Sequence, residues 1–142
     1  MNFASIKRRL NDLSLPFRPS DQRQRLGRRG ERLVARYLQR RRHKILARNY
    51  RCDMGEIDLI SADGDTIVFV EIKTRSSREL QDPQETIGSA KWRRVERAAR
   101  HFLASCDGAG HPCRFDFVSV VWPPHGSPEI EHVEDAFQPR RS

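Results

Sequence analysis

The chain has 142 residues, which is enough for one domain with a single hydrophobic core but not for two. It carries 27 Lys and Arg against 19 Asp and Glu, and the resulting charge of +8 favours a polyanionic partner: nucleic acid, or less readily an anionic membrane surface. No apolar run is long enough for a membrane helix, and no apolar stretch follows the basic residues near the amino terminus, so we expect neither a membrane span nor a secretory signal.

The cysteines indicate the compartment. Cys52, Cys106 and Cys113 are odd in number and lack Cys-x-x-Cys spacing. This pattern argues against a disulfide framework or a zinc site and suits a reducing cytoplasm.

The first 20 residues are expected to form a mobile N-terminal arm, because Pro16 and Pro19 interrupt the short helical pattern that precedes them. A single domain is expected to follow over residues 21–138. It begins with a helix over about Asp21–Arg42, where apolar residues recur at helical spacing.

Glu31 lies on the flank of the apolar stripe of that helix. A carboxylate there is costly unless it has a partner. Two interpretations remain open from spacing alone: Glu31 belongs to a buried site, or it pairs at the helix edge with Arg28 or Arg32.

Two strands joined by a tight turn are predicted at Ile57–Ile60 and Ile67–Ile72, which are apolar and largely β-branched. Asp63-Gly64 favours a two-residue turn between them. If these two residues form the loop, Ala62 pairs with Asp65. The same register places Asp58 opposite Phe69 and Glu56 opposite Glu71.

This register makes Asp58 and Glu71 diagonal neighbours on one sheet face, about 7–8 Å apart. Two carboxylates at that distance repel each other unless a cation lies between them, and hard divalent cations prefer such oxygens. Lys73 points to the same face and could stabilise negative charge. The alternative is that both acids simply face water at strand ends, but Glu71 interrupts a run that otherwise looks like a buried strand.

The remaining elements surround this hairpin. Lys44–Arg51 is predicted to be a strand, Ser76–Pro83 a polar loop beside the candidate site, and Pro83–Ser105 a helix. Trp92 on this helix either stacks on a base or, as is commoner, lies partly buried in the core. The cations that we expect to contact phosphates are Arg75 at the end of the second hairpin strand and, on the helix, Lys91, Arg93, Arg94, Arg97 and Arg100.

Two further strands are predicted near the carboxyl end. Arg114–Val121 would carry Phe115 and Phe117 on one face, and Glu129–Val133 would be an edge strand. The histidines have no metal-ligand spacing, and each is expected to be a lone surface side chain: His43, His101, His111, His125 and His132.

The order of elements, with Asp58 followed by Glu71-Ile72-Lys73 on the next strand, resembles the PD-(D/E)xK nuclease superfamily. More closely, the chain is similar to the YraN family of bacterial proteins, which are predicted endonucleases similar to archaeal Holliday-junction resolvases. The resemblance runs from about Gly27 to Phe137. It is carried by Gly27-x-x-Gly30-Glu31 with Ala35, Asn49-Tyr50-Arg51, Gly55-Glu56-Ile57-Asp58-Leu59-Ile60, Val68-Phe69-Val70-Glu71-Ile72-Lys73-Thr74-Arg75, Lys91, and Arg114-Phe115-Asp116.

The resemblance implies an α/β fold, a restriction-endonuclease-like mixed β-sheet flanked by helices. It also implies that Asp58 and Glu71 hold Mg²⁺ or Mn²⁺, that the backbone carbonyl of Ile72 adds a ligand, and that Lys73 orients or activates the attacking water. Glu31 matches an acidic residue that some resolvase-like relatives add to the metal site.

Lys91 falls where the superfamily often places an extra polar residue near the site. Two departures bear on loop shape rather than on chemistry: Arg41-Arg42-His43 at a helix end and Gln81, where relatives often have glycine.

We therefore expect a metal-dependent endonuclease that acts on DNA, with branched DNA among its candidate substrates. Two alternatives stay open: a catalytically silent nucleic-acid-binding or scaffold protein of the same fold, and an RNA-processing nuclease. A pure binder gains nothing from acids clustered where phosphates must approach. The sequence does not fix the oligomeric state, and a homodimer is compatible with it.

Overall fold

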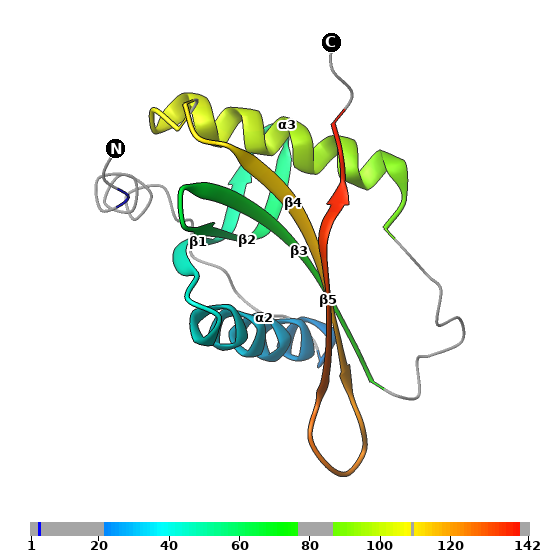
Figure 1. The fold of residues 1–142 in the computed structure, drawn as a ribbon. Helices are drawn as coiled ribbons and strands as arrows, with labels where there is room; N and C mark the ends of the chain where they lie inside the picture. Colours follow the sequence, from blue (N-terminus) through cyan, green and yellow to red (C-terminus); the bar gives the residue numbers. More distant parts are fainter. Residues whose placement is uncertain (1–2, 4–21, 77–86, 109, 140–142) are drawn as a thin grey trace.

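The computed structural model describes residues 3, 22–76, 87–108 and 110–139 (Figure 1). It is an α/β fold in which helices flank a five-stranded mixed sheet, the restriction-endonuclease-like arrangement expected from the sequence. The described elements are α2 (Gln22–Arg40), β1 (Lys44–Cys52), β2 (Gly55–Asp63), β3 (Thr66–Ser76), α3 (Ser89–Ser105), β4 (Cys113–Trp122) and β5 (Glu129–Phe137).

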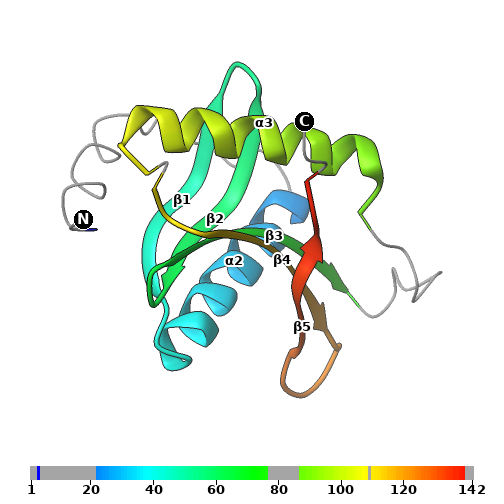
Figure 2. The ribbon, with the colours of Figure 1, turned by 45° about the horizontal axis from the view of Figure 1, so that its top comes forward.

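The strands lie in the sheet in their sequence order, from β1 at one edge to β5 at the other. Neighbouring strands are antiparallel except β3 and β4, which are parallel and are connected through α3. Helix α3 crosses one face of the sheet and α2 lies against the opposite face, as the two views show (Figures 1 and 2). The chain thus forms two hydrophobic layers, one on each side of the sheet.

The layer under α3 is aromatic. The ring of Phe69 on β3 lies 5.9 Å from that of Phe102 on α3 and 5.3 Å from that of Phe115 on β4, measured between centroids. Trp92 is 6% exposed and stacks on Phe137 at 5.2 Å, so it is a core side chain and is not available to a base. The layer under α2 is aliphatic and is built from Val34, Ala35, Leu38, Leu59, Val68, Val70, Val118 and Val120.

Helix α2 packs its backbone directly on β3 at Gly30. A Cβ atom placed on Gly30 would lie 1.9 Å from Oγ1 of Thr74, so only glycine allows this approach. The helix then ends with two reversed hydrogen bonds: the N–H of His43 donates to the carbonyl of Leu38 (2.9 Å), and the N–H of Arg42 to that of Gln39 (3.0 Å). These are the bonds of a Schellman motif, in which Arg42 takes the left-handed conformation (φ 68°) that glycine usually supplies.

The hairpin register differs from the predicted one by two residues. Asp63 pairs with Thr66 and Ala62 with Ile67, so the loop is Gly64-Asp65 rather than Asp63-Gly64. Gly64, with φ 59°, is the first central residue of this turn, the position that a type II′ turn gives to glycine, whereas the predicted loop would have placed it second. The pairing of Asp58 with Phe69 was therefore wrong, since Phe69 pairs with Ile60.

Other predicted elements agree with the structure to within a few residues. Helix α3 begins at Ser89 after Gly88, which is extended, and the predicted start at Pro83 lies outside the described residues, as does most of the polar loop. Of the predicted N-terminal arm only Phe3 is described, and its ring lies against His111. Strand β5 is the predicted edge strand but continues to Phe137.

The prediction of five surface histidines was wrong for two of them. His43 is 6% exposed and shares a hydrogen bond with the hydroxyl of Ser61. The side chain of His132 is 4% exposed and lies 2.8 Å from a carboxylate oxygen of Asp116. Both contacts join residues from different elements, which spacing along the chain does not show. Among the described residues there is no disulfide bond, and no helix is long and apolar enough to span a membrane.

Candidate functional site

At Asp58 the alternation of side chains along β2 is interrupted, so that residues before and after it cover different faces of the sheet. Leu59 packs in the layer under α2, whereas Ile57, two residues earlier, packs in the layer under α3. Strict alternation would place both on one face, so the strand bends between them. On β1 the register places Asn49 opposite Asp58, and Asn49 has a positive φ of 52°. Asparagine tolerates this conformation better than most residues, which allows both strands to bend together.

The bend brings Asp58 directly beside Glu71. The register of β2 and β3 reaches Leu59 and Val70, so the next residues along the two strands are Asp58 and Glu71. Beyond this point the two strands are joined through the side chain of Asp58, because its Oδ2 accepts a hydrogen bond from the N–H of Ile72 at 2.8 Å. The two acids are therefore closer than the diagonal arrangement predicted from the sequence.

Glu71 is 1% exposed, and its two oxygens have different surroundings. Nζ of Lys91 on α3 lies 3.3 Å from Oε2. The other oxygen, Oε1, is buried, and no donor in the described part of the chain reaches it. A buried acceptor without a partner is costly, and at a native site it commonly marks the place of a missing ion or water.

Burial sets the protonation of the pair. Burial first, and the charge of Asp58 second, raise the pKa of Glu71 to about 8, although Lys91 opposes both. Burial also raises the pKa of Asp58, against the hydrogen bond from Ile72 and the charge of Lys91. Adjacent buried carboxyl groups resist carrying two negative charges at neutral pH, and a bound cation removes this resistance.

Glu31 approaches the pair from α2. Burial raises the pKa of Glu31 to about 7, with the charge of Asp58 as the second cause, while a hydrogen bond with the side chain of Asn49 opposes the shift. Glu31 thus belongs to the electrostatic environment of the site and is not merely a partner of neighbouring arginines. Asn49 was not predicted as a site residue. Its only signal in the sequence is its membership of the Asn49-Tyr50-Arg51 motif.

The donor set fits a hard divalent ion in part. Asp58 and Glu71 supply carboxylate oxygens, the ligands that Mg²⁺ and Mn²⁺ prefer, and Oε1 of Glu71 has an unused acceptor position. As placed, however, no three Asp, Glu, His or Cys side chains of the described residues are close enough together to hold an ion. Burial and the charge of Asp58 connect Glu31 to the pair, and its role as a metal ligand stays a prediction.

Lys73 lies two residues beyond Glu71 on β3, where its register partner on β4 is Ser119. It is half-buried. Lys91 is a cation that lies against Glu71, with its Nζ 3.3 Å from Oε2. The proposed ligand role of the Ile72 carbonyl stays a prediction.

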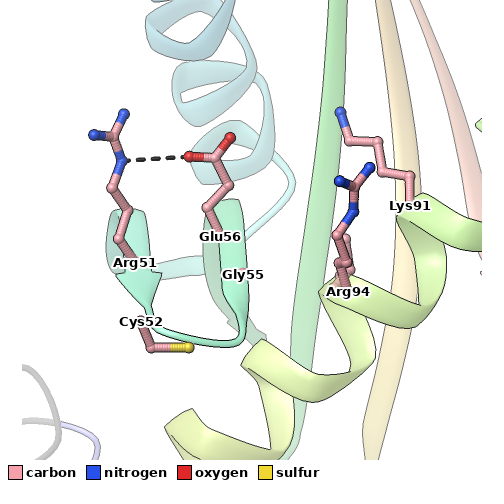
Figure 3. A pocket seen from close by; sticks show the side chains of 7 residues that line it. Arg51, Cys52, Gly55, Glu56, Lys91 and Arg94 are labelled. Carbon is pink, nitrogen blue, oxygen red and sulfur yellow. Dashed lines mark ion pairs between the residues drawn. The ribbon is translucent and has the colours of Figure 1, made fainter.

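A cleft of about 400 Å³ opens beside Lys91, between the β1–β2 turn and α3 (Figure 3). On the strand side, Arg51 and Glu56 form an ion pair at 3.3 Å. On the helix side, Lys91 and Arg94 line the cleft. The described residues that line it are Arg51, Cys52, Gly55, Glu56, Lys91, Arg94 and Val95.

The predicted phosphate-binding residues divide into three groups. Lys91 and Arg94 line this cleft. Arg75 is 7% exposed and so does not present its charge at the surface. The other three line a second groove, of about 350 Å³, between α3 and the end of β5: Arg93, Arg97 and Arg100. In this groove Arg100 forms an ion pair with Glu96 at 2.8 Å.

The Arg114-Phe115-Asp116 motif has a structural role. Asp116 is fully buried and accepts hydrogen bonds from Arg114 and from the N–H of Asp135, with His132 2.8 Å away. Burial alone would raise the pKa of Asp116, but the hydrogen bonds with His132, Arg114 and Asp135 lower it to about 2. This network ties β4 to β5 and contains none of the residues that surround Glu71.

Comparisons with known proteins identify the family. The model of "Uncharacterised protein family UPF0102" matches residues 30–120. The chain belongs to this family, the YraN family. A UPF0102 protein of Geotalea uraniireducens is 43% identical over 113 residues, which cover 80% of this chain and 89% of that protein. UPF0102 proteins of Geobacter metallireducens and Pelotomaculum thermopropionicum are 45% and 40% identical, over 80% and 83% of this chain and 92% and 99% of theirs.

The matched region contains every residue of the candidate site, from Glu31 to Lys91. The predicted family resemblance is therefore confirmed.

Proposed function

We propose that this protein is a metal-dependent endonuclease that hydrolyses phosphodiester bonds in DNA. The observation that carries the proposal is the buried pair Asp58 and Glu71, held side by side by the β2–β3 register and left with an unsatisfied oxygen. Burying two acids side by side costs stability, and a fold that needed only to bind polyanions would gain by losing both. The charge of +8 supports a nucleic-acid substrate.

Each residue has a part in this proposal. Asp58, Glu71 and Glu31 would hold Mg²⁺ or Mn²⁺, and the backbone carbonyl of Ile72 would add a ligand. When bound, such an ion lowers the pKa of water and neutralises charge on the scissile phosphate. The N–H of Ile72 fixes the orientation of the Asp58 carboxylate. Lys91, now 3.3 Å from Glu71, is 51% exposed and can turn toward a phosphate once the negative charge of Glu71 is otherwise balanced.

Lys73 would stabilise the attacking water or the negative charge that develops in the transition state. Removing one such electrostatic interaction typically lowers the rate about a hundredfold or more. Phosphate contacts from the arginines of α3 would add affinity without sequence preference.

The test is single-turnover cleavage of labelled substrates: duplex, single strand, flap, four-way junction and RNA, each with Mg²⁺ or Mn²⁺. On the best substrate, Glu71→Gln, Asp58→Asn and Lys73→Ala should each cut at least about a hundredfold more slowly than the parent. Binding, measured in parallel, should change little for Lys73→Ala, because transition-state contacts contribute little to ground-state affinity.

Asp65→Asn in the β2–β3 turn is the matched control, since it removes one exposed carboxylate at the end of the hairpin, six residues before Glu71, and should cut at the parent's rate. If all three site variants also cut at the parent's rate, the activity comes from elsewhere. If the parent cuts nothing on the panel, the protein is not a nuclease for these substrates.

A further inference from the structure

The cleft between the β1–β2 turn and α3 shares one residue with the surroundings of the Asp58–Glu71 pair. Lys91 belongs to both, because it lines the cleft and lies 3.3 Å from Glu71. Glu56, on the opposite wall, lies two residues before Asp58 on β2, and its charge contributes to the raised pKa of both Asp58 and Glu31. Whatever fills the cleft therefore touches residues that also act on the pair.

The charges that line the cleft suit a phosphate. Its described lining has three cations and one acid, Glu56, which Arg51 already pairs at 3.3 Å. Lys91 forms an ion pair with Glu71, but Arg94, which lines the cleft (Figure 3), pairs with no acidic side chain in the described part of the chain. A guanidinium in this position can grip a phosphate with two parallel hydrogen bonds.

The size of the cleft suits one strand. Its volume of about 400 Å³ lies near the lower end of the range, about 300–1,000 Å³, that small ligands occupy. The floor is closed at Gly55, where a Cβ atom would lie 2.8 Å from the carbonyl oxygen of Arg94, so the turn rests against the helix backbone. The space accommodates a unit the size of a nucleotide but not a double helix.

We propose that this cleft binds the sugar and phosphate of an unpaired strand next to the bond to be cut, so that the substrate is a nucleic acid with a single-stranded segment. The proposal rests on the proposed function for its catalytic consequence, although the binding site stands on its own contacts. Cys52 offers apolar contact to a sugar, and no aromatic ring is among the described lining residues. Recognition is therefore of the backbone and independent of base sequence.

The experiment measures binding without hydrolysis, in EDTA, by fluorescence anisotropy of labelled dT12, rU12 and a 12-base-pair duplex. Arg94→Ser should weaken binding of dT12 or rU12 about tenfold or more, as expected for removal of a charged hydrogen-bonding group. Arg36→Ser is the matched control: it removes the same charge from α2, on the opposite face of the sheet, and should weaken single-strand binding only about twofold. The dT12 and rU12 arms separate DNA from RNA.

A bulky adduct on Cys52 gives a second readout. In a Cys113→Ser protein, a maleimide on Cys52 should abolish dT12 binding by filling the cleft, whereas the same adduct on exposed Cys113 in a Cys52→Ser protein should not. Both labelled proteins keep the full chain, and their circular dichroism spectra report whether they remain folded.

Several outcomes would overturn the inference. These are an equal weakening of dT12 binding by Arg94→Ser and Arg36→Ser, a weakening of duplex binding by Arg94→Ser as large as that of dT12 binding, or dT12 binding that survives the Cys52 adduct. Failure of the proposed function is a separate result: a parent protein that cuts nothing, yet binds dT12 through Arg94, keeps the single-strand site and loses the nuclease.

Discussion

At the residue scale, the protonation of Glu71 links the candidate site to the stability of the fold. Burial, then the charge of Asp58, raise the pKa of Glu71 to about 8 from 4.5. A raised acid pKa means that the folded protein binds this proton more tightly than the unfolded chain does. The stabilisation is therefore fully present below pH 4.5 and is lost as the pH rises through about 8. Glu31, with a pKa of about 7, acts in the same direction.

We predict that in EDTA the free energy of unfolding falls between about pH 5 and about pH 8, with Glu71 alone contributing at most about 1.4 kcal/mol per pH unit. Glu71→Gln cannot ionise and should make this fall shallower, which urea unfolding at fixed ionic strength measures. Glu131→Gln should keep the parent's pH dependence, because this exposed side chain lies outside the buried pair. Superimposable curves for the parent and Glu71→Gln would contradict the raised pKa.

At the scale of one element, the end of α2 is held by a non-glycine residue in an unfavourable conformation. Arg42 has φ 68°, which costs an L-residue about 1–2 kcal/mol relative to glycine, while glycine loses about 0.5–1 kcal/mol more entropy on folding. We predict that Arg42→Gly stabilises the protein by about 0.5–1 kcal/mol. Arg36→Gly, six residues earlier and exposed inside the helix, should instead destabilise by about 1 kcal/mol. Thermal unfolding of both variants is the measurement, and a decrease in stability for Arg42→Gly would contradict the capping account.

The sequence predicted the elements and the central pair, because strand patterns and the Glu71-Ile72-Lys73 run are local signals. It misplaced the register because Asp63-Gly64 is a common turn dipeptide, whereas the chain turns one residue later with Gly64 first. The meeting of Glu31 with Asn49 depends on the bend of β1, and alternation alone predicts no bend.

Contacts between side chains of different elements could not be predicted from the sequence either. The stacking of Trp92 on Phe137 and the buried contact of His132 with Asp116 join segments that only the finished sheet brings together. For single residues of these types, the usual prior is exposure for histidine and burial for tryptophan. That prior failed for the first and held for the second.

At the scale of the whole molecule, the sheet separates two basic surfaces. Helices α2 and α3 lie on opposite faces (Figure 2), so one rigid duplex cannot lie along both. Glu71 is paired with a lysine of α3, which makes the α3 face the side from which a backbone would reach the candidate site. Arg93, Arg97 and Arg100 are exposed cations of the second groove on that face, and Glu96 pairs with Arg100, whereas Arg32 and Arg36 are exposed on α2.

We therefore predict that the double variant Arg93→Gln with Arg97→Gln weakens duplex binding. It should also flatten the dependence of log K on log salt by about 0.9 for each phosphate that the protein no longer neutralises. The matched double variant, Arg32→Gln with Arg36→Gln, removes the same charge from the other face and should leave the slope nearly unchanged. Both are measured by anisotropy titrations across a series of salt concentrations. If the α2 pair flattens the slope and the α3 pair does not, the duplex lies on the α2 face. Lys91 would then be too remote from its path to grip the same backbone.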